Sequence, residues 1–163
     1  LRRRLPEAET EGLTPDFNGD ETAIRRVLEA RPAVFNHNVE TVERLSSEIR
    51  TRATYRRSLE VLHFAASAGG GIPVKSGLML GLGENDGEVR RTLRDLREAG
   101  VSIVTIGQYL PPSAAHWPLA RYVTPEEFEA YGAFARELGF RAVASAPLVR
   151  SSYHAGELVR ETR

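Results

Sequence analysis

Polar side chains follow the apolar run "PAVF" in a pattern that suggests ligand binding. Asn36, His37 and Asn38 come directly after that run, and Glu40 stands two residues further on. Amide and carboxylate groups can hydrogen-bond the hydroxyls of a ribose and the headgroup of an amino acid. A single asparagine here would be explained by a turn, and Asn38 could cap the next helix. The full set of polar side chains favours a binding site over that structural explanation.

A glycine-rich stretch, "KSGLMLGLGE", ends with Gly81, Gly83 and Glu84. Glycine lets the backbone come close to another backbone or to a ligand. The spacing matches neither the dinucleotide fingerprint G-x-G-x-x-G nor the phosphate-binding Walker A motif. The stretch alone is therefore also typical of a tightly packed turn, and Lys75 at its start is typical of a surface lysine.

Two further clusters lie near the C-terminal end. Residues 107–123 contain adjacent prolines, the only tryptophan of the chain and a histidine, which is typical of a rigid loop on the surface or at a substrate site. Residues 150–155 read "RSSYHA". Taken alone, this motif favours Ser151 or Ser152 as the cap of a terminal helix. A Ser152–His154 nucleophile is disfavoured, because this spacing points the side chains apart on a helix and no G-x-S-x-G elbow is present.

Strand and helix patterns alternate along the whole chain, which predicts a parallel sheet. The predicted strands lie within residues 9–19, 32–38, 74–84, 101–110 and 140–148, and the predicted helices within 21–30, 39–50, 53–68, 85–100, 124–139 and the tail. Asn85 or Asp86 should cap the fourth helix, and Thr124 with Glu127 has the spacing of a capping box.

The fold class is therefore α/β, either an open doubly wound sheet or part of a (β/α) TIM-type barrel. A complete barrel needs about 250 residues, and the chain has 163, so a barrel would be partial. The polar clusters fall at the predicted strand ends, which share one rim in a barrel but spread along an edge in an open sheet. This placement favours the partial barrel.

Composition limits the classes of function. The chain has 22 basic and 22 acidic side chains, which argues against electrostatic binding of nucleic acid or of anionic membranes. No apolar run approaches the roughly 20 residues of a membrane span, and no leader pattern is visible, so a cytoplasmic protein is expected. The absence of cysteine excludes disulfides, thiolate metal ligands and a cysteine nucleophile from this chain. The four histidines are scattered and form no metal-binding pair.

Several motifs together resemble one family. They are "TPDFNG", "RPAVFNHNVETV", "RATYRRSLEVL", "KSGLMLGLGE", "TIGQYLPPS" and "PLVRSSYHA", which follow one another from about Leu13 to Ala155. In this order they resemble lipoyl synthase, a radical S-adenosylmethionine (radical SAM) enzyme. Biotin synthase shares looser forms of "NHN" and "GLGE", whereas "GQYLPPS" and "RSSYHA" favour lipoyl synthase.

The resemblance implies a reaction, its cofactors and its partners. Lipoyl synthase inserts two sulfur atoms at C6 and C8 of an octanoyl group attached to a lysine of a carrier protein. It uses S-adenosylmethionine and two 4Fe–4S clusters, one of which is consumed as the sulfur donor. The implied partners are an octanoylated carrier domain (a 2-oxoacid dehydrogenase E2 component or the glycine cleavage H protein) and an electron donor.

The resemblance also assigns residues. Contacts with S-adenosylmethionine are implied for Asn36, Asn38, Glu40, Gly81, Gly83 and Glu84, and contacts with the cofactor or the acyl group for Arg52 and Ser58. Ser152 matches an oxygen ligand to one iron of the auxiliary cluster, and Arg150 would lie beside that cluster.

The chain departs from the family in one respect. The two cysteine motifs of the family, C-x4-C-x5-C and C-x3-C-x2-C, are absent. We therefore expect a C-terminal portion that is inactive alone, with a partial barrel over residues 1–148 and a tail over 149–163. Exposed strand edges predict poor solubility for such a portion. The alternatives are a biotin-synthase-like enzyme and a cluster-free module that binds acylated carrier domains.

Overall fold

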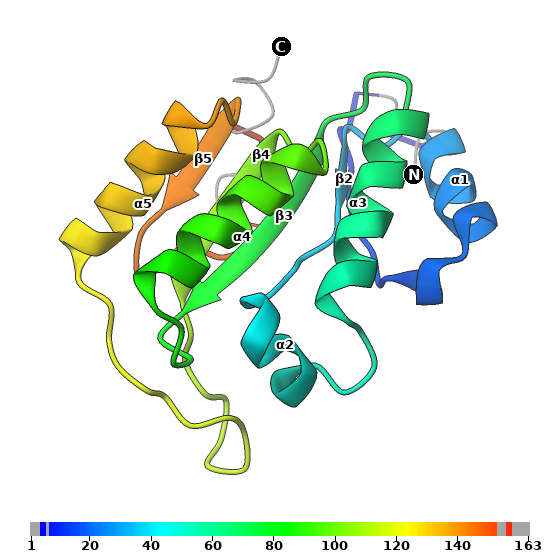
Figure 1. Cartoon of the computed structure of the whole chain (residues 1–163). Coiled ribbons are helices and arrows are strands. Elements are labelled where there is room, and N and C mark those ends of the chain that lie inside the picture. Colours follow the sequence, from blue (N-terminus) through cyan, green and yellow to red (C-terminus); the bar gives the residue numbers. More distant parts are fainter. Residues whose placement is uncertain (1–3, 6, 153–155, 158–163) are drawn as a thin grey trace.

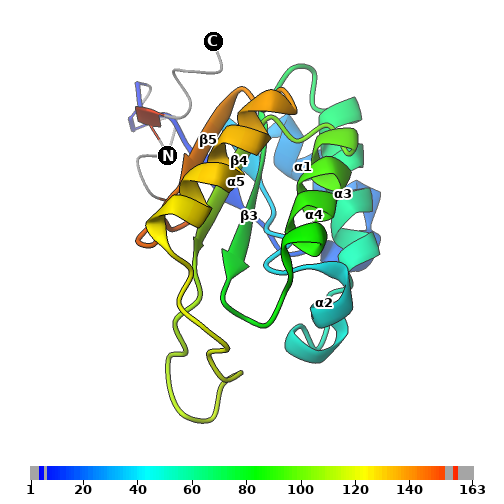
Figure 2. The same cartoon turned by 60° about the vertical axis from the view of Figure 1, so that its left-hand side comes forward.

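The protein forms a five-stranded parallel sheet whose helices lie on one face (Figures 1 and 2). The computed structural model describes residues 4–5, 7–152 and 156–157. The strands are β1 (Glu11–Leu13), β2 (Val34–Asn36), β3 (Val74–Leu80), β4 (Ile103–Gln108) and β5 (Ala142–Ser145), and the helices are α1 (Glu21–Glu29), α2 (Glu43–Ile49), α3 (Tyr55–Ala68), α4 (Asp86–Glu98) and α5 (Pro125–Glu137), with a short 3-10 helix over Phe17–Gly19.

The order of the strands decides between the two predicted folds. They lie side by side in the sequence order β1-β2-β3-β4-β5, and every pair is parallel. With this order the crossover helices collect on one face of the sheet, as in a barrel (Figures 1 and 2). A doubly wound sheet would reverse its order and place helices on both faces. The prediction of a partial (β/α) barrel is confirmed, and within the described residues the sheet stays open between β1 and β5.

The ends of the helices follow local chemistry. Asn85 caps α4, and its side chain and that of Glu88 each accept from the other's backbone N–H. Thr124 and Glu127 form the same capping box at α5. The predicted start of α2 at residue 39 is wrong, because Glu40 is held by β3 instead. Its N–H donates to the Gly77 carbonyl (3.0 Å), so α2 begins only at Glu43.

The two faces of the sheet differ in character. The face under the helices carries the main core, with Phe35, Leu78, Leu80 and Ile106 fully or almost fully buried. The other, concave face carries only a small apolar cluster of Val34, Ile103 and Ala142. Polar residues occupy much of the remaining concave face, which is therefore the face that can hold a polar ligand. No helix in the described part of the chain is both long and apolar enough to cross a membrane.

Lys75 lies on the concave face and is buried, with 1% of its side chain exposed. Its Nζ lies 2.9 and 3.0 Å from the carboxylate oxygens of Glu11, and Asn36 Nδ2 donates to the same carboxylate at 2.7 Å. The expectation of a surface lysine is wrong, because the alternation along β3 turns this side chain inward. The three residues come from three strands and tie β1, β2 and β3 together.

Replacing Glu11 with alanine leaves the Lys75 ammonium buried without its counter-charge. Removing one partner of a buried pair costs about 3 to 5 kcal/mol. Glu11 keeps 18% of its side chain exposed, so we expect the lower end, about 3 kcal/mol, in urea unfolding followed by circular dichroism.

The matched control is Glu60→Ala, which removes the exposed Arg56–Glu60 pair on α3. We expect it to change the free energy of unfolding by less than about 1 kcal/mol. Equal losses in the two variants would contradict a stabilising role for the Glu11–Lys75 pair.

Candidate functional site

A small cavity lies on the concave face, where the ends of β2, β3 and β4 meet the segment that follows β5. Its lining residues are Asn38, Glu40, Gly77, Leu78, Met79, Thr105, Gly107, Val149, Arg150 and Ser151. Parallel strands bring their carboxyl ends to one edge, so residues more than a hundred positions apart share this cavity. The cavity unites two clusters that were predicted separately, the polar residues after β2 and the "RSS" segment.

Two glycines leave room in this cavity. A Cβ on Gly77 would lie 2.8 Å from Asn38 Oδ1 and 3.1 Å from Thr105 Oγ1. A Cβ on Gly107 would collide with the carbonyl oxygen of Val149. Glycine is required at Gly107 because another backbone passes directly over it. The segment around Val149, which follows β5, therefore packs directly on the end of β4.

Asn38 offers an acceptor to a ligand. Its Oδ1 is buried and has no hydrogen-bond partner among the described residues. Leaving a buried acceptor unpaired costs about 1 to 3 kcal/mol. The unpaired Oδ1 therefore lowers the stability of the fold unless a ligand donates to it. Asn36 Oδ1 is likewise buried without a partner among the described residues. Asn36 differs in that its Nδ2 donates to Glu11 and the residue does not line the cavity.

Glu40 lies in the same cavity in an unusual backbone conformation. Its φ is +66°, a left-handed value that costs a non-glycine residue about 1 to 2 kcal/mol. Two ladder bonds to β3 hold it there, the second from Met79 N–H to the Glu40 carbonyl (2.9 Å). Burial raises the pKa of its carboxyl group, while a hydrogen bond from Asn38 and the charge of Arg50 partly oppose the shift.

Arg50 is a site-adjacent residue that the sequence reasoning missed. Its Nη1 donates to the Val39 carbonyl (3.2 Å) and to Ser58 Oγ (2.8 Å), next to Glu40. The sequence has arginines at both 50 and 52, and their spacing alone does not say which one turns inward. Arg52, which was predicted to face a ligand, is exposed and does not line the cavity.

Ser58 is a fully buried residue of helix α3 and also lies outside the cavity. Its Oγ lies 2.9 Å from His37 Nε2, and His37 Nδ1 donates to the Thr14 carbonyl at 2.9 Å. Burial lowers the pKa of His37, which fits a neutral ring that accepts from Ser58. This chain of hydrogen bonds fixes Ser58, which in turn accepts from Arg50 Nη1.

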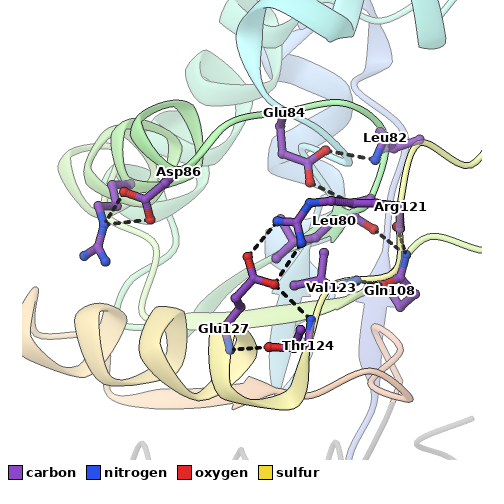
Figure 3. A network of polar contacts seen from close by, with 11 residues as sticks. Leu80, Leu82, Glu84, Asp86, Gln108, Arg121, Val123, Thr124 and Glu127 are labelled. Carbon is purple, nitrogen blue, oxygen red and sulfur yellow. Dashed lines mark hydrogen bonds and ion pairs between the residues drawn. The ribbon is translucent and has the colours of Figure 1, made fainter.

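The glycine-rich turn after β3 is stabilised by its own carboxylate (Figure 3). Glu84 accepts from the N–H groups of Gly81 (2.7 Å) and Leu82 (2.9 Å). Gly81 has φ +97°, and a Cβ there would collide with Gln108 and the Arg121 carbonyl. Gly83 is exposed with φ +112°. Gly81, Gly83 and Glu84 follow β3 and therefore lie at the same edge of the sheet as the cavity of Asn38 and Glu40. They do not line that cavity.

Gln108 fastens the long loop that follows β4 (Figure 3). The two N–H groups of its Nε2 are shared among the carbonyls of Leu80 (3.0 Å), Tyr109 (3.0 Å) and Arg121 (3.3 Å). Its Oε1 accepts from Val123 N–H at 2.9 Å. A buried amide with every partner supplied fixes both ends of the loop to the strand.

The "RSS" segment crosses the rim at the end of β4. Arg150 Nη1 donates to the carbonyls of Val149 (2.8 Å) and Gln108 (3.4 Å). Arg150 and Ser151 line the cavity, and Ser152 is exposed. Tyr153, His154 and Ala155 lie outside the described residues, as does most of the predicted terminal helix.

Comparison with known proteins identifies the family. The model of the radical SAM superfamily matches residues 1–96. The chain belongs to the radical SAM superfamily. Its described residues hold no cluster of three or more histidine, aspartate or glutamate side chains that could bind a metal, so this radical SAM chain provides no complete metal site within that part.

Curated relatives narrow the resemblance. The chain is 55% identical over 163 residues to the lipoyl synthase of Rubrobacter xylanophilus, covering 100% of the chain and 51% of that protein. It is 56% identical over 155 residues to the lipoyl synthase of Flavobacterium psychrophilum, and 52% identical over 155 residues to the mitochondrial lipoyl synthase of Nematostella vectensis, each time with 95% of the chain and 53% of the relative covered. The predicted resemblance is confirmed, and the chain spans about half the length of these relatives.

The raised pKa of Glu40 predicts how stability depends on pH. A carboxyl whose folded pKa lies above its ordinary value of 4.5 binds protons more tightly in the folded state. Its contribution to stability is therefore present below that value and is lost as the pH rises through the folded pKa. We expect Glu40→Gln to increase the free energy of unfolding at about pH 7 and to have less effect at about pH 4.

Urea unfolding at several pH values measures this difference. Glu98→Gln, which changes an exposed carboxylate at the end of α4, is the matched control and should not follow the same pH dependence. A Glu40→Gln variant that is less stable than the parent protein at neutral pH would contradict the prediction.

Proposed function

We propose that this chain is about half of a lipoyl synthase, which inserts two sulfur atoms at C6 and C8 of an octanoyl group on a carrier lysine. One observation supports this most strongly. The cavity joins the "NHN" and "RSS" motifs, which come from opposite halves of the chain and carry the resemblance. Identities of 52 to 56% to lipoyl synthases extend over 95 to 100% of the chain.

The cavity fits part of S-adenosylmethionine. The unpaired Asn38 Oδ1 needs a donor, which a ribose hydroxyl or an ammonium group provides. Gly77 and Gly107 leave the strand backbone open to close approach. When bound, S-adenosylmethionine supplies the radical chemistry. In our proposal Asn38 and Glu40 bind and orient it, while Gly81, Gly83 and Glu84 shape the neighbouring rim.

The assignments with less structural support are Asn36, Arg52 and Ser58. None of them lines the cavity. We propose that Asn36 acts through the buried Glu11 cluster and that Ser58 acts through Arg50. Arg52 remains a proposal that rests on the resemblance.

This chain could provide only part of the ligands of the auxiliary cluster. It has no cysteine, so thiolate ligands would have to come from residues outside it. We propose that Ser152 provides one oxygen ligand and that Arg150, fixed by two carbonyls, lies beside it. A hard alkoxide makes one iron different from its thiolate-bound neighbours, which suits a cluster that is dismantled during the reaction. The tail over residues 149–163 would then be a functional unit distinct from the barrel over residues 1–148.

The remaining parts of the proposal follow from the reaction. Two 4Fe–4S clusters, an electron donor and an octanoylated carrier domain, either the E2 component of a 2-oxoacid dehydrogenase or the glycine cleavage H protein, are its cofactors and partners. The equal numbers of basic and acidic side chains favour neither nucleic acid nor anionic membranes. We propose a cytoplasmic location.

One observation favours a second candidate function. A chain without cysteine suits a cluster-free module that binds acylated carrier domains. The reading frame upstream of Leu1 separates the two candidates. We expect it to encode six cysteines in the motifs C-x4-C-x5-C and C-x3-C-x2-C, whereas a start codon directly before Leu1 would support the module.

The role of Ser152 is tested in the full-length protein with reconstituted clusters. We expect Ser152→Ala to lower formation of the lipoyl group by more than about tenfold and to alter the Mössbauer spectrum of the auxiliary cluster. Reductive cleavage of S-adenosylmethionine should continue, because it depends on the other cluster. The product is measured by mass spectrometry of the carrier.

Ser151→Ala, which removes the neighbouring hydroxyl from the cavity wall, is the matched control for the spectrum and should leave the Mössbauer signal of the auxiliary cluster unchanged. Similar spectral changes in the two variants would contradict a specific role for Ser152. Unchanged sulfur insertion in Ser152→Cys would contradict a special role for oxygen at that iron.

A further inference from the structure

The loop formed by residues 109–124 projects beyond the ends of β3 and β4, at the edge of the sheet where the cavity lies (Figures 1 and 2). It connects β4 to α5 without a helix or strand of its own. A connection longer than about 12 to 15 residues without secondary structure is uncommon in compact domains and usually functional. The loop is not needed to cover the core, because most of its side chains are exposed.

The exposed surface of this loop is mostly apolar and has no acidic side chain. Leu110 is 45% exposed and Tyr122 is 71% exposed, although both are large hydrophobic residues. The other exposed residues of the loop are Pro111, Pro112, Ser113, Ala114, Ala115, His116, Pro118, Ala120, Arg121 and Thr124. Residues 99–125 contain no aspartate or glutamate. Depletion of charge with exposed tyrosine and arginine is typical of the centre of a protein–protein interface.

The loop is also held in place at several points. Besides the Gln108 amide, Trp117 Nε1 donates to the Leu82 carbonyl (3.0 Å), and Tyr109 Oη donates to the Trp117 carbonyl (2.8 Å). Arg121 forms a bidentate ion pair with Glu127, with distances of 2.7 and 2.8 Å (Figure 3). A surface that is already ordered loses less conformational entropy when a partner binds.

We propose that the loop of residues 109–124 is the docking surface for the protein domain that carries the acylated lysine. The inference rests on the proposed function. A lysine side chain with an eight-carbon acyl group reaches roughly 15 Å from its own backbone, so the body of the carrier must stay at the rim while its arm reaches toward the S-adenosylmethionine proposed for the cavity. The projecting loop lies at that edge of the sheet, and its mostly apolar exposed surface, which has no acidic side chain, suits contact with the body of the carrier.

The test compares two substrates in the full-length protein with reconstituted clusters. One is the octanoylated carrier domain, and the other is a short peptide with one octanoylated lysine. We expect the double variant Leu110→Ser/Tyr122→Ser to raise the KM for the carrier domain by at least about tenfold. The kcat for the domain and both constants for the peptide should stay unchanged, because the peptide has no body to dock.

A matched pair of charge insertions separates the loop from the rest of the surface. Ala114 lies in the loop and Ala130 lies on α5, and both are exposed. We expect Ala114→Glu to weaken binding of the carrier domain, measured by titration calorimetry, and Ala130→Glu to leave it unchanged.

Three results would overturn the inference. They are equal losses on the domain and the peptide, unchanged affinity of the loop variants for the domain, and a loop-dependent change of oligomeric state in light scattering, which would identify a second copy of the protein as the occupant. Failure of the parent protein to convert either substrate would contradict the proposed function instead. Calorimetric binding of the carrier domain would then still decide the role of the loop.

Discussion

The one-directional winding of the parallel sheet is the constraint on which this structure depends. Because all five strands run the same way and lie in sequence order, their carboxyl ends reach one edge and their helices cover one face. The concave face is left for polar groups. That arrangement brings Asn38 and Glu40, which follow β2, to the same cavity as Arg150, which follows β5.

The rim of the sheet contains two kinds of polar group. Glu84 and Gln108 have all or most of their hydrogen-bonding capacity used by the backbone, and they stabilise the turn and the loop that surround the site. Asn38 and Glu40 are less well satisfied. The Asn38 Oδ1 is a buried acceptor without a partner among the described residues, and Glu40 combines a left-handed backbone with a partly desolvated carboxyl group. Locally unfavourable groups inside a frame of satisfied hydrogen bonds are typical of functional sites, which supports the proposed binding role of Asn38 and Glu40.

The same distinction applies to charge. The Lys75 ammonium is buried but matched by Glu11, so it holds three strands together and is not free to bind a ligand. The exposed Ser152 has no comparable structural duty in the described part of the chain. A hydroxyl at the rim beside a fixed Arg150 is consistent with a ligand to a group whose other ligands lie outside this chain.

The sequence by itself determined the types of element, the capping box of Thr124 and Glu127, the parallel sheet and the family, and it reduced the cap of α4 to Asn85 or Asp86. These features depend on local periodicity, on side-chain hydrogen bonds to neighbouring backbone and on motif order. The sequence also located the polar clusters at the strand ends. Only the tertiary structure decided that Lys75 is buried, that Arg50 rather than Arg52 turns inward and that Glu84 is used by its own turn. Those outcomes depend on which groups other strands and loops bring within hydrogen-bonding distance, and no local pattern contains that information.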